Sequence, residues 1–210
     1  MPDLPYGGGA MTDTVIARAW NAEAPTPSHE KFSSGVLVLG IGNPLLSDDG
    51  LGIHALEVLR SDSRLPSATR LLDGGTFGPE LLGQLGGCRR LLLLDAVDAG
   101  RAPGTIVRVD LDGNCTAARK TSVHEFGINE LLDDLRLLGE APDEVLLLGI
   151  QPASVALGTS LTPDVLTAVP ALLEAAVNQL IRWEGERADE CSGKELRKKN
   201  SGFETLGGVI

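Results

Sequence analysis

Three polar side chains follow apolar segments at points where ligand-binding groups could gather. Asp49 lies in the glycine-bearing turn Gly40–Gly50, Asp95 directly follows four consecutive leucines, and His124 lies at the start of an amphipathic segment. In open α/β sheets, ligands collect outside the carboxyl ends of the strands. Two carboxylates and one imidazole suit a borderline divalent cation such as nickel or zinc, and three protein ligands leave positions open for water or substrate. The pattern therefore suggests a cation site.

Each of these side chains also has a purely structural interpretation. Ser47, Asp48 or Asp49 could cap the following helix, because side-chain oxygens accept hydrogen bonds from the free N–H groups at a helix start. Asp95 could simply end its strand with its hydrogen bonds satisfied, and His124 could lie on the surface. Residue types alone suggest the cation site without specifying it.

A nucleotide site is a further interpretation of the same turn. Gly40-Ile41-Gly42 after an apolar run, with Asp73 farther on, imitates part of a dinucleotide-binding motif. However, Leu45 occupies the third glycine position, and Asp73 lies farther along the chain than the motif's spacing of about 20 residues. The acidic pair Asp48-Asp49 would also repel a pyrophosphate. These features favour a cation over a phosphate.

The elements that must position these residues follow from the hydrophobic pattern. Uninterrupted apolar runs are typical of strands covered on both faces, and Ser122 with Glu125 fits a capping box before an amphipathic helix. The final helix contains Pro170, which should break or kink it. The expected strands are 36–41, 70–73, 91–94, 105–111 and 145–150, and the expected helices are 50–60, 79–85, 122–138 and 162–183. This alternation predicts an α/β fold, a mostly parallel sheet sandwiched by helices on both faces (three-layer α/β/α).

The two ends of the chain differ from its middle. Residues 1–33 carry glycine and proline clusters without a sustained apolar period, and residues 185–210 are rich in charge. We expect a flexible N-terminal extension over 1–33, a single catalytic α/β domain over 34–184, and a flexible C-terminal tail over 185–210.

Composition restricts the class of partner. The chain has 18 basic and 29 acidic residues, a net charge of −11, which disfavours nucleic acid and anionic membranes. There is neither a basic segment followed by an apolar one at the start nor an apolar run of about 20 residues, so a cytoplasmic protein is expected. Cys88, Cys115 and Cys191 are scattered, as free thiols in a reducing compartment are. The basic neighbours of Cys88 could lower its thiol pKa, although a buried thiol is the more ordinary interpretation.

The segment Val38–Gly52 carries a motif in which G-x-G-N is followed by apolar residues and an acidic residue that opens a helix. This motif resembles the opening motif of the nickel-iron hydrogenase maturation endopeptidases (peptidase family M52). Further similar segments follow in order over about 36–182: Asp73-Gly74-Gly75-Thr76, Asp95-Ala96-Val97-Asp98, Pro103-Gly104-Thr105, Ser122-Val123-His124, Gly149-Ile150-Gln151-Pro152 and Leu161-Thr162-Pro163. The resemblance to this family implies a three-layer, phosphorylase/hydrolase-like fold.

The resemblance also implies roles for individual residues. The family's metal-binding carboxylates map to Asp49 and Asp95, and its imidazole maps to His124. Asp73 maps to an acidic residue near the site that acts in substrate handling or catalysis. The three residues implied as ligands are the ones that their positions after apolar segments already indicated.

The activity implied by the resemblance is removal of a C-terminal extension from a hydrogenase large-subunit precursor after nickel insertion. The Ni²⁺ would arrive with the precursor, no organic cofactor would be needed, and the enzyme would be a cytoplasmic monomer. The partner would be the nickel-loaded precursor, not nucleic acid or membrane. Two alternatives stay open: a non-catalytic nickel-checkpoint chaperone for the precursor, and a mononucleotide-binding α/β domain.

Overall fold

The computed structural model describes residues 35–76, 80–111 and 125–200, all within one compact unit, Lys31–Ile210. The expected extension over 1–33, the capping residue Ser122, His124 and residues 201–210 lie outside the described residues. The strands are β1 (Val36–Gly40), β2 (Arg70–Asp73), β3 (Arg90–Ala96), β4 (Ile106–Asp110) and β5 (Glu144–Ile150). The helices are the 3-10 helix η1 (Ser47–Gly50), α2 (Leu51–Leu59), α3 (Glu80–Leu85), α4 (Glu125–Leu138) and α5 (Pro163–Asn200).

The described strands form one sheet in the order β2-β1-β3-β5-β4. β1 pairs in parallel with β2 and β3, and β3 pairs in parallel with β5. β4 is antiparallel to β5 and lies at the edge. The chain leaves β1 toward β2 on one side and returns to β3 on the other, so the topological switch point lies between β1 and β3. In an open α/β sheet this is where a ligand-binding crevice forms.

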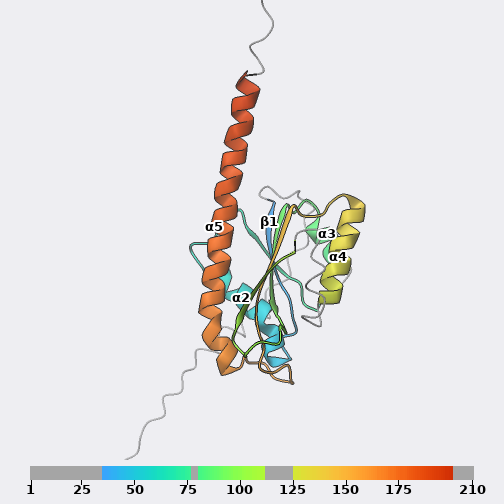
Figure 1. Cartoon of the computed structure of the whole chain (residues 1–210), viewed down its shortest axis with the longest axis vertical. Helices are drawn as coiled ribbons and strands as arrows, with labels where there is room; N and C mark the ends of the chain where they lie inside the picture. Colours follow the sequence, from blue (N-terminus) through green and yellow to red (C-terminus); the bar gives the residue numbers. More distant parts are fainter. Residues whose placement is uncertain (1–34, 77–79, 112–124, 201–210) are drawn as a thin grey trace, which may run out of the picture. The chain divides into compact units, whose positions relative to one another are not determined.

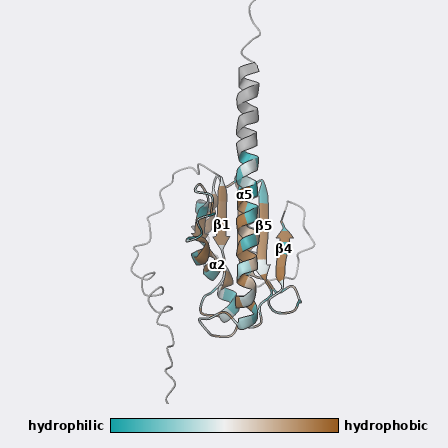
Figure 2. Ribbon diagram, turned by 90° about the vertical axis from the view of Figure 1, so that its left-hand side faces the viewer, coloured by the Kyte–Doolittle hydropathy of each residue, from teal (hydrophilic) through white to brown (hydrophobic). Residues whose placement is uncertain are grey.

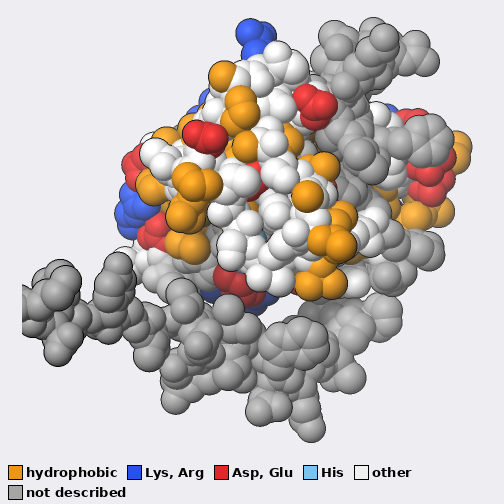
Figure 3. Space-filling view, turned by 90° about the horizontal axis from the view of Figure 1, so that it is seen from below, with side chains coloured by type: hydrophobic (Ala, Val, Ile, Leu, Met, Phe, Trp, Pro, Cys, Tyr) orange, Lys and Arg blue, Asp and Glu red, His pale blue; other side chains and the backbone are white. Residues whose placement is uncertain are grey.

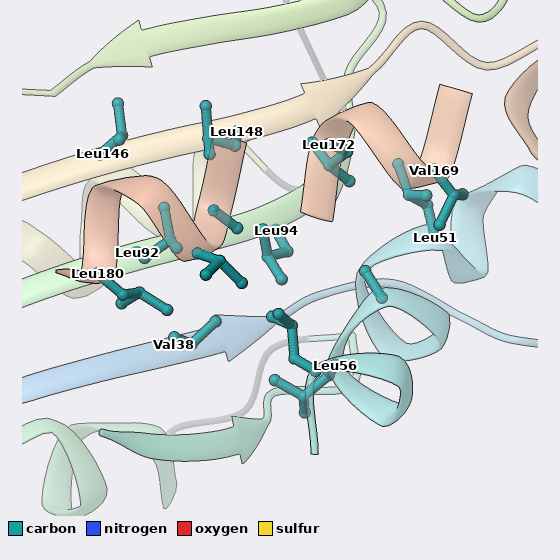
Figure 4. Close-up of a cluster of buried hydrophobic side chains, with 14 of the residues drawn as sticks. Val38, Leu51, Leu56, Leu92, Leu94, Leu146, Leu148, Val169, Leu172 and Leu180 are labelled. Atoms are coloured by element: carbon teal, nitrogen blue, oxygen red, sulfur yellow. The ribbon is translucent and has the colours of Figure 1, made fainter. Parts of the chain in front are cut away.

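Strand alternation divides the core into two clusters, one on each face of the sheet. On one face, Val38, Leu92 and Leu148 pack with side chains of α2 and α5 (Figure 4). On the other face, Leu39, Leu93 and Leu147 pack with side chains of α3 and α4. Figure 1 shows the two pairs of helices on opposite sides of the sheet, and the strands in Figure 2 are mostly brown, hence hydrophobic. The predicted three-layer α/β/α architecture is confirmed.

The helix α4 follows the predicted pattern with one exception. Ile128, Leu131, Leu132 and Leu135 are buried, as an amphipathic helix requires. Leu138 continues the same apolar spacing, but it is the last residue of the helix and is 62% exposed.

The last helix differs from its prediction in two respects. Pro170 does not break α5, and the helix does not end near Trp183 but continues to Asn200. A proline inside a helix costs about 3 kcal/mol, whereas each fully buried Val or Leu stabilises by about 1.5–3 kcal/mol. Val165, Leu172 and Val177 of α5 are all fully buried against the sheet, which outweighs the cost of the proline.

The segment Pro163–Arg187 is also long and apolar enough, by length and composition alone, to cross a membrane. Its buried side chains belong to the core cluster on the α2 and α5 face. The helix packs as part of the core, and this packing accounts for the apolar side chains of the segment.

A polar cluster joins α5 to the amino ends of β3 and β5. The buried Arg90 donates from Nη1 to the backbone oxygen of Trp183 at 2.6 Å and from Nε to Glu144 Oε1 at 3.2 Å. The Trp183 indole Nε1 donates to Glu144 Oε2 at 2.7 Å, and Arg90 Nη2 lies 3.1 Å from Glu186 Oε2. Glu186 thus anchors the helix about one turn beyond Trp183.

We expect Arg90→Met to lower the free energy of unfolding by about 2–3 kcal/mol, less than for a fully buried pair, because both glutamates stay partly exposed. The matched control is Arg89→Met, since Arg89 pairs with Asp143 at 2.7 Å on the surface. Surface pairs contribute about 0–1 kcal/mol, so the control should unfold close to wild type. Urea unfolding followed by circular dichroism measures both, and equal losses would contradict the structural role of Arg90.

Candidate functional site

Glycines allow the Gly40–Gly50 turn to lie directly against the ends of the central strands. A Cβ on Gly52 would come within 2.2 Å of the Leu94 oxygen and 2.3 Å of the Ile41 oxygen, so the first turn of α2 touches the ends of β1 and β3. Gly42 has φ +129°, and a Cβ there would lie 1.8 Å from the Asp49 oxygen. η1 contacts β3 directly. The turn therefore brings Asp49 to the switch point.

Asp49 is largely buried, and its side chain turns back toward the preceding loop. Its Oδ2 accepts a hydrogen bond from the Asn43 backbone N–H at 2.8 Å. The residues that precede the two helical segments, Leu46 before η1 and Gly50 before α2, make no side-chain capping bond. Neither Asp48 nor Asp49 is therefore the N-cap residue, although both lie in the first turn of η1, where a carboxylate is favoured.

Asp48 has a different role that the sequence did not reveal. Its fully buried carboxylate accepts backbone hydrogen bonds from Ala153, Ser154 and Thr162 at 2.9, 3.0 and 2.6 Å, and one from the Thr162 hydroxyl at 2.8 Å. These bonds join η1 to the loop after β5 and to the start of α5. Asp48 is thus a positioning residue for the turn that carries Asp49.

Asp95 is fully buried and belongs to β3, whereas the sequence placed it just after the strand. Its Oδ1 accepts a hydrogen bond from the Ala96 backbone N–H at 2.8 Å. Side chains alternate along a strand, so Asp95 shares the face of Leu91 and Leu93, the face that α4 covers. The neighbouring strand end is close, since the Ile41 N–H donates to the Leu94 oxygen at 2.9 Å.

His124 lies outside the described residues, directly before α4. α4 precedes β5 in the chain and ends near its amino end, so the start of α4 is directed toward the opposite, carboxyl edge. Among the described residues, no group of three His, Cys, Asp or Glu side chains could hold a metal ion. The structure thus places Asp49 in η1 and Asp95 near the end of β3, at the same edge of the sheet, and the ligand role of Asp49, Asp95 and His124 stays a prediction.

Asp73 ends β2, next to β1, and its side chain is exposed. Its Oδ1 accepts a hydrogen bond from the Gly75 N–H at 2.9 Å. The segment continues along the turn, because the Gly74 N–H donates to the Gly40 oxygen and the Gly42 N–H donates to the Gly75 oxygen, both at 2.8 Å. Asp73 is therefore at the rim of the same edge, on the β2 side.

Gln151 belongs to the motif Gly149-Ile150-Gln151-Pro152, and its side chain organises a neighbouring loop. Its buried side chain accepts backbone hydrogen bonds from Ala99 and Arg101, and its amide nitrogen donates to Asp98 Oδ1 at 3.1 Å. This last bond lowers the pKa of the Asp98 carboxyl, with a further contribution from the Gly100 N–H. Gln151 therefore holds the loop that follows Asp95.

Cys88 is an inert thiol. Burial raises its pKa to about 12 and outweighs the backbone hydrogen bonds of Arg90 and Leu37 and the charge of Arg70, which lower it. The buried interpretation is confirmed over the reactive one, because a thiol in an apolar environment resists forming a thiolate.

His54 in α2 is a half-buried imidazole whose Nε2 has no hydrogen-bond partner among the described residues. Burial lowers its pKa from the ordinary value of 6.5. Near pH 6.5 and just below it, His54 is protonated more readily in the unfolded chain than in the folded chain. The free energy of unfolding should therefore fall as pH falls from about 7 to about 5.

We expect His54→Gln to flatten this loss of stability, because glutamine does not titrate. Urea unfolding of wild type and variant at both pH values gives the comparison. An equally steep fall in the variant would assign the pH dependence to other groups.

Comparison with known proteins supports a single family. A family model described as hydrogenase maturation protease (HycI) matches residues 53–179. The chain is 38% identical over 151 residues to the hydrogenase expression/formation protein HupD of Rhodobacter capsulatus, covering 70% of this chain and 72% of that protein. It is 36% identical over 148 residues to the hydrogenase 2 maturation protease of Escherichia coli K12, covering 70% and 88%.

A solved structure agrees with this relationship. The E. coli hydrogenase maturating endopeptidase HybD superposes with a TM-score of 0.64 at 35% identity, covering 70% of this chain and 92% of that one. The resemblance stated from the motifs is thus confirmed, and the nucleotide interpretation has no support. The chain belongs to the hydrogenase maturation protease family and is a hydrolase, an endopeptidase.

Proposed function

We propose that this endopeptidase removes the C-terminal extension of a [NiFe]-hydrogenase large-subunit precursor after nickel insertion, as the final step of maturation. The observation that carries the proposal is two buried carboxylates at the same edge of the sheet, Asp95 in β3 and Asp49 in η1, the 3-10 helix that contacts β3. A buried carboxylate is costly unless it is paired, hydrogen-bonded or bound to a metal. Their position at the switch point is where a substrate group would enter.

The donor set suits nickel that arrives as part of the substrate. Carboxylate oxygens and an imidazole nitrogen are ordinary ligands for such a cation, and Asp49, Asp95 and His124 would supply them. The N–H groups of Asn43 and Ala96 each hold one carboxylate oxygen, and outer-shell bonds of this kind orient ligands. A cation bound there would polarise the scissile carbonyl and acidify a water.

The remaining roles belong to residues around the pair. Asp73 at the rim would handle the substrate chain or a proton during cleavage. Asp48 and Gln151 would keep the two segments that carry Asp49 and Asp95 in place. The enzyme would act as a cytoplasmic monomer, without an organic cofactor of its own.

The proposal is tested by incubating the protein with purified large-subunit precursor, with and without nickel, and measuring precursor mass. We expect loss of the C-terminal extension only from the nickel-loaded precursor. Equal cleavage of the nickel-loaded and nickel-free precursor would contradict the proposed requirement for nickel. A stable complex with nickel-loaded precursor and no cleavage would favour a non-catalytic checkpoint chaperone instead.

A further inference from the structure

An uncharged apolar surface lies beside the site, on the two loops that meet at η1. Leu45, Val155 and Leu157 are 59%, 55% and 87% exposed. The Gly158 N–H donates to the Leu45 oxygen at 3.0 Å, so the two loops are adjacent at these residues. Figure 3, which views the end at which α5 begins, shows hydrophobic side chains on this face, together with acidic side chains. We call these three residues the loop surface.

The loop surface is held in place by the same bonds that position Asp49. The Ser47 N–H donates to the Gly158 oxygen at 2.8 Å, and the Asp48 N–H donates to the Ser154 oxygen at 3.1 Å. The buried Asp48 carboxylate adds its four bonds to Ala153, Ser154 and Thr162. A partner would therefore meet preordered loops, which reduces the entropy lost on binding.

Charge indicates the chemistry of the occupant. Residues 43–47 and 151–162 contain no Asp, Glu, Lys, Arg or His, although the chain as a whole has a net charge of −11. Single exposed apolar residues are common on proteins, but neighbouring ones on fixed loops mark an interaction site. An uncharged surface attracts neither a basic nor an acidic segment, so it favours apolar side chains.

We propose that the loop surface binds an apolar stretch of the substrate polypeptide next to its scissile bond. An endopeptidase must hold the substrate chain on at least one side of the cleaved peptide. Leu45 is four residues before Asp49, whose Oδ2 is bonded to the N–H of Asn43 in the same loop. The identity of the substrate as the large-subunit precursor rests on the proposed function, whereas the location of the binding surface does not.

The chain offers a matched control for each residue of the loop surface. Leu137, Leu138 and Val58 are 86%, 62% and 52% exposed, close to Leu157, Leu45 and Val155 respectively. Leu137 and Leu138 end α4, near the amino ends of the strands, and Val58 lies near the end of α2. Serine substitutions in the two sets remove the same side chains from different places.

The experiment compares the triple variants L45S/V155S/L157S and V58S/L137S/L138S. Both also carry Asp95→Asn, so that the precursor stays intact. Biolayer interferometry measures the Kd of each variant for nickel-loaded precursor. We expect the first variant to weaken binding at least about tenfold, because burying one Leu on binding corresponds to that order of affinity. The control variant should bind within about twofold of the background. In cleavage assays without Asp95→Asn, the first variant should raise KM with little change in kcat, as lost ground-state binding does.

The other outcomes separate the two proposals. If wild type binds the precursor but does not cleave it, the proposed function fails, while the Kd comparison still decides the role of the loop surface. Equal Kd values for the two triple variants would overturn that role. A wild-type dimer in sedimentation that L45S/V155S/L157S dissolves would also overturn it, by making a second copy of this chain the occupant.

Discussion

Asp95→Asn should reduce cleavage of the nickel-loaded precursor at least about a hundredfold, because even outer-shell partners of metal ligands cost about 10- to 100-fold when changed. The carboxylate is fully buried in β3 and its Oδ1 is bonded to the Ala96 N–H. Asparagine keeps the shape and an oxygen for that bond, but it removes the charge that would face a cation. Mass spectrometry of the precursor over time gives the rate.

Asp110→Asn provides the control for Asp95→Asn. Asp110 is an exposed aspartate at the end of β4, where its carboxylate pairs with Arg108 at 3.3 Å on the surface. The Asp110→Asn variant should process the precursor at the wild-type rate. Thermal unfolding of both variants checks that the loss at Asp95 is not a loss of fold. Normal cleavage by Asp95→Asn would exclude Asp95 from the metal-binding and catalytic set.

Gly42→Ala should destabilise the protein by about 2–5 kcal/mol, the sum of a positive-φ penalty and of crowding in a packed site. Gly42 has φ +129°, and the added Cβ would lie 1.8 Å from the backbone oxygen of Asp49. Two backbone segments meet there, so neither can move without shifting η1. We therefore expect both a lower unfolding midpoint in urea and loss of cleavage at temperatures where the variant is folded.

Gly139→Ala separates the two causes. Gly139 also has a positive φ, +70°, but a Cβ there meets nothing within 4 Å. Its cost should be limited to about 1–2 kcal/mol of backbone strain, with cleavage unchanged. If the two variants lose equal stability, backbone strain alone accounts for Gly42, and the close approach to Asp49 is not needed to explain it.

The strands around the site could be predicted from sequence because each is covered on both faces. A strand in that position needs an uninterrupted apolar run, and Leu91–Leu94 and Val36–Ile41 have one. The carboxylates near their ends could also be found from the sequence, because Asp95 directly follows the leucine run and Asp49 lies in the turn that follows Val36–Ile41. Helix α4 could also be predicted, because its leucines recur with the helical period of 3.6 residues and this spacing is visible in the local sequence.

The course of α5 needed the tertiary structure. Local propensity favours a break at Pro170 and an end near Gly185, yet the helix passes both. Its apolar side is buried on the sheet, and the contact between Glu186 and Arg90 extends the anchored part beyond Trp183. Such contacts join residues far apart in the chain, so no local pattern reports them.

The Gly40–Gly50 turn shows both contributions at one site. The sequence by itself determined that the turn is acidic, and its motif mapped the expected ligand role to Asp49, because residue types and motif positions can be found from the sequence alone. Only the tertiary structure showed what Asp48, the adjacent aspartate of the same chemistry, does. Asp48 is the structural one because the groups that bond to it lie 105 to 114 residues along the chain. Asp49 instead accepts its hydrogen bond from Asn43 within its own turn, and η1, which carries it, contacts β3, the strand that contains Asp95.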